Sequence, residues 1–212
     1  MKLYSYWRST SSYRVRIALA LKGIEVEYVP VHLVRNGGEQ NSCAYRKINQ
    51  QGRVPALVLD DGRVLTQSPA ILEYLDETFQ EPPLLPSDPV DRANVRSIAA
   101  IIACDIHALH NVGTLNYLRR NFGLAEKEVN AWIATWISQG LEAVEQKLSE
   151  RGYAAGDAPS IADIYLLPQL YAARRFGVDL NAFSKTLRVE ALASANPAFV
   201  RAHPAQQPDA ET

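Results

Sequence analysis

The sequence predicts a small α/β domain followed by an all-helical domain. Short β-type runs alternate with helical runs over residues 2–79, an order typical of an α/β domain. The stretch PPLLPSDP at residues 82–89 carries four prolines, which disfavour helix and strand. Helical patterns fill the rest of the chain. We therefore expect an α/β domain over residues 1–81, a linker over 82–89 and a helical domain over 90–212.

The first elements predicted are a strand, a helix and a second strand. Leu3–Tyr6 is β-type, and the Ala- and Leu-rich run Ser12–Lys22 is helical. Gly23 stands where a glycine commonly ends a helix. Val26–His32 is the second strand, and its proline at position 30 favours an edge of the sheet.

A hairpin and a helix complete the α/β domain. ALVL and RVL flank Asp-Asp-Gly within residues 56–65, and Asp-Gly suits a tight hairpin turn. Ser68 is expected to cap the next helix, with Pro69 at its first position. The predicted order is β-α-β-α-β-β-α.

Three long helices are predicted beyond the linker. Asp88 and Pro89 begin one of about 30 residues, whose isoleucines recur near helical spacing. Glu126–Ser149 forms the second. Ser160 and Asp163 make a capping box that begins the third.

Composition indicates a globular protein of the reducing cytoplasm. Hydrophobic residues make up 47% of 212, and 22 basic residues against 23 acidic ones give a net charge of −1. This balance offers no long-range attraction to nucleic acid or to an anionic membrane. Two cysteines, Cys43 and Cys104, do not make a disulfide framework. The N-terminal residues lack the apolar core of a signal peptide, and we see no run of about 20 apolar residues.

Several segments resemble the zeta class of the glutathione transferases, a class that includes maleylacetoacetate and maleylpyruvate isomerases. The segments are RSTSSYRVRIALALKGI, GRVPALVLDDG, LTQSPAILEYLDE, LLPSDPVDRA, APSIADIYLLPQLYAARRF and HPAQQPD, and they cover nearly the whole chain. The resemblance implies a thioredoxin-like first domain, an all-α second domain and glutathione as cofactor. It also implies a homodimer.

The serine cluster is the expected thiol end of a glutathione site. A helix N-terminus with hydroxyl donors stabilises a thiolate, and Ser9, Thr10 and Ser11 occupy such a terminus. The resemblance gives these three residues a catalytic role, although the family often has Cys at position 11. An ordinary serine-rich helix cap is the alternative interpretation.

Other glutathione contacts follow from the resemblance. It places a cis-proline at Pro55, after Val54, whose backbone would bind the peptide. The backbone N–H groups at the start of the helix after the hairpin, where Gln67 and Ser68 lie, suit the γ-glutamyl carboxylate of glutathione. The remaining contacts that the resemblance implies are at Gln40, Gln67, Ser68, His107 and Asn111.

The resemblance to these isomerases implies substrates with two carboxylates, and such substrates require cationic side chains in the site. The candidates are Arg8, which precedes the serine cluster, and Arg175, which matches a family arginine; Arg119, Arg120 and Arg174 fit solvated helix charges. We expect no metal, since His107, His110 and Cys104 do not supply a full set of ligands.

The resemblance implies glutathione-dependent cis-trans isomerisation, and we expect the reaction to convert maleylpyruvate to fumarylpyruvate in gentisate breakdown. The serine at 11 and the histidine at 107 favour this substrate over maleylacetoacetate, from tyrosine and phenylalanine breakdown. A conjugating or dehalogenating transferase is an enzymatic alternative. A glutathione-binding regulatory protein of the same fold is the non-enzymatic one, because a fold alone does not determine function.

Overall fold

The computed structural model describes residues 1–211, and these form two compact units. Unit 1 comprises residues 1–83 together with 195–211, and unit 2 comprises residues 84–194. In this division residues 195–211 group with the α/β unit, whereas the sequence predicts a helical domain that continues to residue 212. Domain boundaries in the sense of independently folding parts stay a prediction.

A four-stranded mixed sheet is the centre of unit 1. Its strands are β1 (Lys2–Ser5), β2 (Glu27–Pro30), β3 (Ala56–Val58) and β4 (Val64–Thr66), in the order β2-β1-β3-β4. β1 runs parallel to β2 and antiparallel to β3, and β3 and β4 form the predicted hairpin. The edge position of β2 fits its Pro30, which has no N–H to donate.

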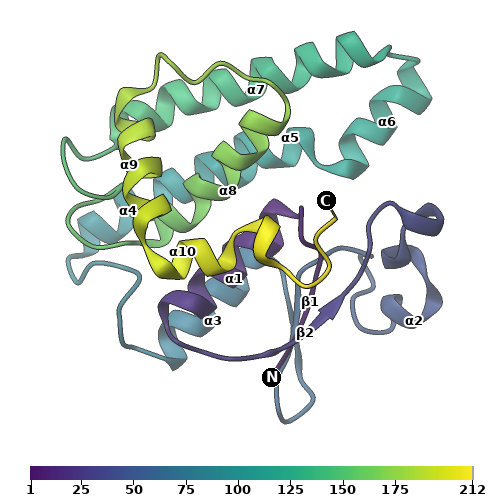
Figure 1. The fold of residues 1–212 in the computed structure, drawn as a ribbon, viewed down its shortest axis with the longest axis horizontal. Coiled ribbons are helices and arrows are strands. Elements are labelled where there is room, and N and C mark those ends of the chain that lie inside the picture. The colour runs from purple at the N-terminus through teal and green to yellow at the C-terminus, as the bar shows by residue number, and fades with distance from the viewer. Residues whose placement is uncertain (212) are drawn as a thin grey trace. The chain divides into compact units, whose positions relative to one another are not determined.

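Helices cover both faces of this sheet. α1 (Thr10–Leu21) packs against α3 (Ser68–Thr78) and against α10 (Pro197–Ala202), as Figure 1 shows. Side chains alternate across a strand, so Leu3 is 1% exposed beneath these helices while Tyr4 points to the opposite face. There its ring lies 5.9 Å from that of Tyr45 in α2 (Cys43–Arg46).

The remaining short helices of unit 1 lie in its connecting segments. They are η1 (Arg35–Gly37), η2 (Glu39–Asn41) and η4 (Pro204–Gln206). The predicted stop of α1 is confirmed, because Gly23 follows the C-cap residue Lys22 with a φ of 65°. This left-handed conformation suits glycine, which has no Cβ to clash.

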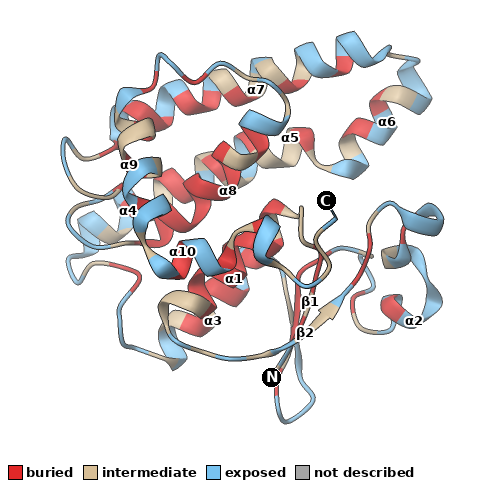
Figure 2. Ribbon diagram, in the orientation of Figure 1, coloured by how far each residue is buried: buried red, intermediate tan, exposed pale blue. Residues whose placement is uncertain are grey.

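Unit 2 is all helical, as predicted. Its elements are α4 (Pro89–Ala100), the π-helix η3 (Ile101–His107), α5 (Ala108–His110), α6 (Val112–Phe122), α7 (Glu126–Lys147), α8 (Ile161–Arg175) and α9 (Ser184–Ala195). Its core includes Ile102, Ile106 and Ile133, none of which is exposed. The buried faces of these helices are drawn in red in Figure 2.

The long helix expected after Asp88 is interrupted. After α4 it continues as the π-helix η3 and the short helix α5, and it ends at Asn111, whose backbone is extended with a ψ of 158°. The Asn111 side chain accepts a hydrogen bond from the backbone N–H of Thr114 at 3.1 Å, which starts α6. Asparagine favours such caps because its side chain competes with the backbone for hydrogen bonds.

One helical stretch, Pro89–Phe122, is long and apolar enough to cross a membrane by length and composition alone. The core helix of a soluble protein meets the same criterion, and Ile98, Ile102 and Ile106 of this stretch are buried within unit 2. The stretch is therefore weak evidence for a membrane span.

Candidate functional site

The predicted thiol site lies where β1 passes into α1 in unit 1. The backbone N–H of Ser9 donates to the Tyr6 carbonyl at 3.0 Å, which closes a turn between the two elements. Ser9 is the N-cap of α1, and its hydroxyl oxygen accepts from the backbone N–H of Ser12 at 3.2 Å. Thr10 and Ser11 form the first turn of the helix. Sequence analysis thus placed the cluster correctly at a helix N-terminus.

The hydroxyl groups of the cluster differ in their exposure. Ser9 and Ser11 are partly exposed, whereas Thr10 and Ser12 are buried. The Ser12 hydroxyl has no hydrogen-bond partner among the described residues. The N-terminus of α1 carries partial positive charge from its unpaired N–H groups, so an anion placed beside the partly exposed serines is stabilised.

Arg8 directly precedes the cluster and is held by two aromatic neighbours. Its guanidinium carbon lies 4.9 Å from the centre of the Trp7 ring, and its Nη2 donates to the Tyr6 hydroxyl at 3.2 Å. These contacts fix a cation beside the N-terminus of α1. Stacking of this kind suits the flat guanidinium group.

A second helix N-terminus carries Gln67 and Ser68, and here one expectation was wrong. Ser68 is the first residue of α3 and Gln67 is its N-cap, so Ser68 does not cap the helix. The Ser68 hydroxyl instead accepts from Nη1 of Arg14 at 3.4 Å. Because Arg14 belongs to α1, this contact joins the two helices that start at the candidate site.

Gln67 has an unusual backbone conformation, with φ at 70° and ψ at 116°. A residue with a side chain rarely adopts positive φ, and such strain persists only where the surroundings enforce it. Its side-chain amide is exposed and donates to Oε1 of Gln51 at 2.7 Å. Sequence analysis did not predict this strain, which has no local sequence signal.

Val54 and Pro55 are joined by a cis peptide bond, as the resemblance implied. Both residues are buried and lie just before β3.

Gln40 lies in η2, after β2, and its Nε2 donates to the Leu33 carbonyl at 3.3 Å. Its Oε1 is buried without a hydrogen-bond partner in the described part of the chain. A ligand N–H group would satisfy this oxygen.

The other candidates lie in unit 2. His107 ends η3, and its ring is 5.3 Å from that of His110, which is buried against Gln169. Asn111 uses its side-chain Nδ2 to donate to the Ala108 carbonyl at 2.7 Å, in addition to its capping contact. Arg175 is the exposed last residue of α8 and stacks 4.5 Å over the Phe176 ring.

Two arginines that sequence analysis read as solvated helix charges have carboxylate partners. Arg174 pairs with Glu190, which raises the pKa of Arg174, and Arg119 pairs with Glu126.

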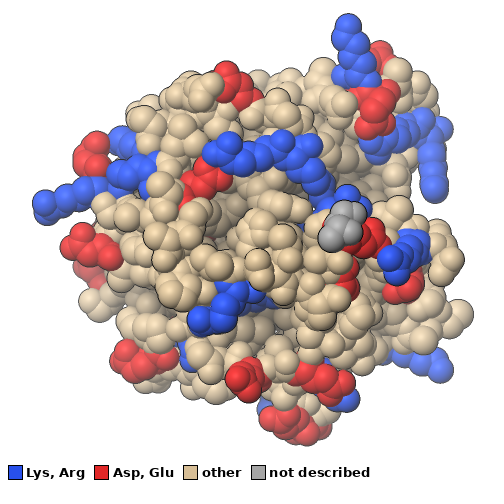
Figure 3. Space-filling model, in the orientation of Figure 1, with Lys and Arg blue, Asp and Glu red and all other residues tan. Residues whose placement is uncertain are grey.

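Basic and acidic side chains of the described residues are interspersed over the face drawn in Figure 3. Among residues 1–211 no group of three or more His, Cys, Asp or Glu is arranged to hold a metal ion.

Sequence analysis missed residues that hold the serine cluster in place. Arg14 and Arg16 lie in the RVRIAL part of a segment quoted for its resemblance, and Asp209 lies in HPAQQPD. Arg14 of α1 binds Ser68 at the start of α3, while Arg16 of α1 and Asp209 of the C-terminal segment bind the backbone of Trp7, two residues before Ser9. The resemblance of these segments was the available signal, but it did not say what the residues contact.

Comparisons with known proteins show the family of this chain. Residues 8–78 match the family described as glutathione S-transferase, N-terminal domain, and residues 127–201 match its C-terminal domain. The chain is 57% identical to maleylacetoacetate isomerase of Pseudomonas aeruginosa, over 99% of this chain and 98% of that protein.

Two solved structures are also similar. A holo maleyl pyruvate isomerase, described as a bacterial glutathione transferase of the zeta class, superimposes with a TM-score of 0.95 at 48% identity over 100% of both chains. Maleylacetoacetate isomerase of Methylobacterium extorquens with bound malonate and GSH gives 0.94 at 40% identity, again over 100% of both chains. This chain therefore belongs to the glutathione S-transferase family, and within that family to the zeta class.

Proposed function

We propose that this protein is a glutathione-dependent cis-trans isomerase of maleyl ketoacids, with maleylpyruvate as substrate and fumarylpyruvate as product. The observation that carries the proposal is the placement of partly exposed Ser9 and Ser11 at the N-terminus of α1, directly after Arg8. This arrangement brings together a site for a thiolate and a cation for a carboxylate. Maleylacetoacetate is the second candidate, favoured by the 57% identity to an isomerase named for it.

The residues present fit glutathione. The partnerless Gln40 Oε1 offers an acceptor for a peptide N–H, and the N-terminus of α3 at Gln67 and Ser68 suits a carboxylate. We infer that the backbone of Val54, before Pro55, binds the peptide of glutathione, and that His107 and Asn111 of unit 2 add further contacts. Bound glutathione would supply a thiol that adds reversibly to the cis double bond, so that the bond can rotate while it is single.

The roles of the protein groups follow from their charges. The Ser9 oxygen accepts the Ser12 N–H, and the Ser9 O–H is still able to donate a hydrogen bond. We assign this donor to an anion at the helix N-terminus. We propose that the hydroxyl groups of Thr10 and Ser11 act on the same anion. A thiol that is held as thiolate by such donors is a stronger nucleophile at neutral pH.

The arginines serve the substrate. The guanidinium group of Arg8 is held by the Trp7 ring and the Tyr6 hydroxyl, and we assign to it a carboxylate of the ketoacid. Arg175 is the second arginine of the proposed site. Negative charge develops on the keto oxygen during addition to the double bond, and a fixed cation lowers the energy of that charge.

The test is a pair of substrate assays. Purified protein with maleylpyruvate is expected to give fumarylpyruvate only when glutathione is added, with glutathione recovered unchanged. Turnover without glutathione would contradict the mechanism. The ratio of kcat/KM for maleylpyruvate and maleylacetoacetate decides which ketoacid is the substrate.

The same assays decide between the isomerase and its rivals. Consumption of glutathione with halide release or formation of a stable conjugate would indicate a transferase or dehalogenase. Retention on immobilised glutathione without turnover of either ketoacid would indicate a binding protein. We further propose that the protein acts in the cytoplasm, as a homodimer, in breakdown of aromatic compounds. Sedimentation of the purified protein tests the dimer.

A further inference from the structure

The backbone of Trp7 is held through both its N–H and its carbonyl, which belong to the two successive peptide groups on either side of this residue. Its N–H donates to Oδ2 of Asp209 at 3.1 Å, and its carbonyl accepts from Nη2 of Arg16 at 2.9 Å. Trp7 immediately precedes Arg8 and stands two residues before Ser9. The backbone that carries the proposed site is therefore fixed by two ionisable side chains from other parts of unit 1.

Arg16 is buried and serves several carbonyl groups. It is 5% exposed, and it also donates to the Tyr6 carbonyl at 3.3 Å and to the Ala202 carbonyl at 3.0 Å. The guanidinium group has donors in a fixed planar arrangement, so these acceptors are held in fixed relative positions. Arg16 thus ties the turn before Ser9 to the end of α10.

Asp209 is held in turn by Tyr28. The Tyr28 hydroxyl donates to Oδ1 of Asp209 at 2.7 Å, which leaves Oδ2 directed at Trp7. Burial, with a contribution from the Asp209 hydrogen bond, raises the pKa of Tyr28, so its hydroxyl stays protonated and remains a donor. The carboxylate therefore has a defined orientation.

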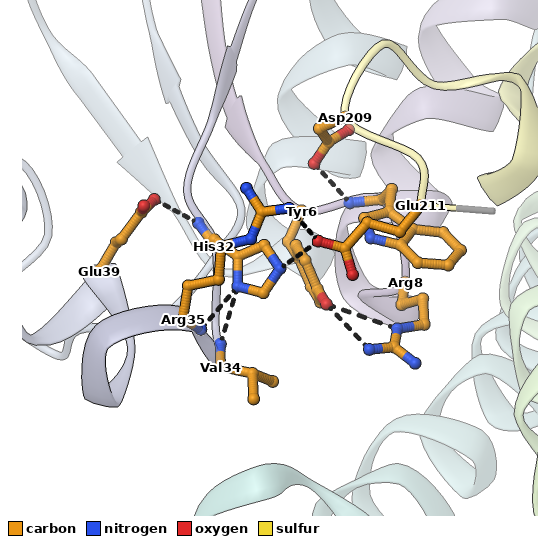
Figure 4. A network of polar contacts seen from close by, with 9 residues as sticks. Tyr6, Arg8, His32, Val34, Arg35, Glu39, Asp209 and Glu211 are labelled. Carbon is orange, nitrogen blue, oxygen red and sulfur yellow. Dashed lines mark hydrogen bonds and ion pairs between the residues drawn. The ribbon is translucent and has the colours of Figure 1, made fainter.

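A second contact fastens the same C-terminal segment. Glu211 accepts from Nε2 of His32 at 3.1 Å and pairs with Arg35. Nδ1 of His32 accepts the backbone N–H groups of Val34 and Arg35, so the imidazole joins the loop after β2 to the segment. Figure 4 shows Asp209 and Glu211 on one short stretch of chain, with the Glu211 carboxylate directed toward His32 and Arg35.

We propose that Asp209 is a positioning residue for the serine cluster. It touches neither the thiol nor the ketoacid in this scheme; it binds the backbone N–H of Trp7 so that Arg8 and Ser9 keep their places at the N-terminus of α1. A displacement of about 1 Å in an active site can reduce turnover by about a hundredfold, so such a fixed backbone matters for rate. This inference rests on the proposed function.

The experiment compares substitutions at Asp209 with a surface control. Asp209→Ala removes the acceptor for Trp7, whereas Asp209→Asn keeps a carbonyl oxygen that can accept the same N–H. Glu27→Ala is the matched control, because Glu27 precedes Tyr28 on β2 and pairs only with exposed Lys2 among the contacts described. Glu211→Gln tests whether any loosening of the segment has the same effect.

The first measurement uses the protein without glutathione. Amide hydrogen exchange over residues 6–12 is expected to be faster in Asp209→Ala than in the parent, and to return toward the parent rate in Asp209→Asn. Glu27→Ala should leave it unchanged. Parent-like exchange in Asp209→Ala would overturn the proposal, and so would an equal acceleration in Glu211→Gln.

The second measurement concerns turnover. Asp209→Ala is expected to lower kcat by about tenfold with a smaller change in KM for the ketoacid, because orientation rather than substrate contact is lost. Wild-type kcat in a variant with accelerated exchange would overturn the positioning role. If the parent protein shows no isomerase activity, the proposed function fails, and the pKa of the thiol of bound glutathione in the same variants takes the place of kcat. An unchanged thiol pKa in Asp209→Ala would then overturn the inference.

Discussion

The hydroxyl oxygen of Ser9 accepts the backbone N–H of Ser12, so the serine proposed to face the thiol also caps α1. The observed role in capping the helix and the proposed role in binding the thiol therefore fall on the same hydroxyl group. A substitution at position 9 removes a thiol donor and a helix cap together. Separating the two effects requires a pair of variants that differ in only one of them.

Ser9→Ala and Ser9→Gly form that pair. Loss of an N-cap to Ala costs about 1 kcal/mol, whereas Gly at the same position costs only a few tenths. Both variants are expected to raise the pKa of the bound glutathione thiol, since both lack the hydroxyl, but only Ser9→Ala should lower the free energy of unfolding appreciably. Ultraviolet titration of the thiolate and denaturant unfolding measure the two quantities. A parent-like thiol pKa in Ser9→Gly would show that another hydroxyl activates the thiol.

Gln67→Gly should separate stability from binding. Positive φ at a residue with a side chain costs about 1–3 kcal/mol, and glycine removes this cost, though it also adds freedom to the unfolded chain. We expect unchanged or higher stability together with weaker glutathione binding, measured by thermal unfolding and calorimetric titration.

Asn36→Gly is the matched control for that variant. Asn36 is the other non-glycine residue with positive φ among those described, at 54°, and asparagine tolerates this region well. It lies in η1 and is not among the proposed glutathione contacts, so its replacement should leave glutathione affinity unchanged. Equal loss of affinity in both variants would refute a specific role for Gln67.

Gly140 of α7 has Ile106 of η3 packed directly over its Cα, where a Cβ would collide with the isoleucine side chain. Alanine in a helix is favoured over glycine by about 1 kcal/mol, but overpacking a core costs about 1–3 kcal/mol. Gly140→Ala is therefore expected to destabilise the protein by about 1 kcal/mol. A double-mutant cycle with Ile106→Ala, followed by denaturant unfolding, should show strong coupling. Additive effects would mean that the collision is relieved elsewhere.

Glu145 of α7 caps the start of α9. Its carboxylate accepts from the backbone N–H groups of Lys185 at 2.7 Å and Thr186 at 2.9 Å. Burial opposes ionisation, but the hydrogen bonds from Thr186 and Lys185 outweigh it and hold the pKa of Glu145 below its ordinary value of 4.5. A lowered pKa in the folded state adds stability above the unfolded pKa and loses it as pH falls through the folded value.

Glu145→Gln should therefore be less stable than the parent by about 1–2 kcal/mol at pH 7, because a charged acceptor becomes neutral. The difference should shrink as the pH falls below about 4.5. Denaturant unfolding at a series of pH values measures it. A difference that stays constant down to the acid limit would show that the carboxylate charge contributes nothing.

Local sequence signals predicted the elements that depend on local chemistry. The Asp-Asp-Gly turn between β3 and β4, Gly23 after α1 and the Asp163 carboxylate on the Ser160 N–H are all present. Each depends on residues close together in sequence, where turn and cap preferences act directly. The class of fold followed from the order of those elements.

What sequence reasoning missed depends on distant contacts. Ser68 binds Arg14, 54 positions away, rather than capping α3. The exception is Asn111, which ends a helix that periodicity alone would continue through local contacts with Ala108 and Thr114. The hydrogen bond from the Trp7 N–H to Asp209 joins residues 202 positions apart, and no local sequence pattern predicts such a contact. The serine cluster was predicted from the resemblance and from its place at a helix start, whereas the distant residues that support it were not predicted.

The return of residues 195–211 to unit 1 has a consequence for biosynthesis. A growing chain is made from its N-terminus, so residues 84–194 have all emerged before α10 exists. Until then the turn before Ser9 lacks both Asp209 and the Ala202 carbonyl that anchors Arg16. A product released at residue 194 would contain every proposed glutathione contact yet hold its serine loop loosely. Synthesis of residues 195–211 thus sets the moment at which the thiol site takes its final shape.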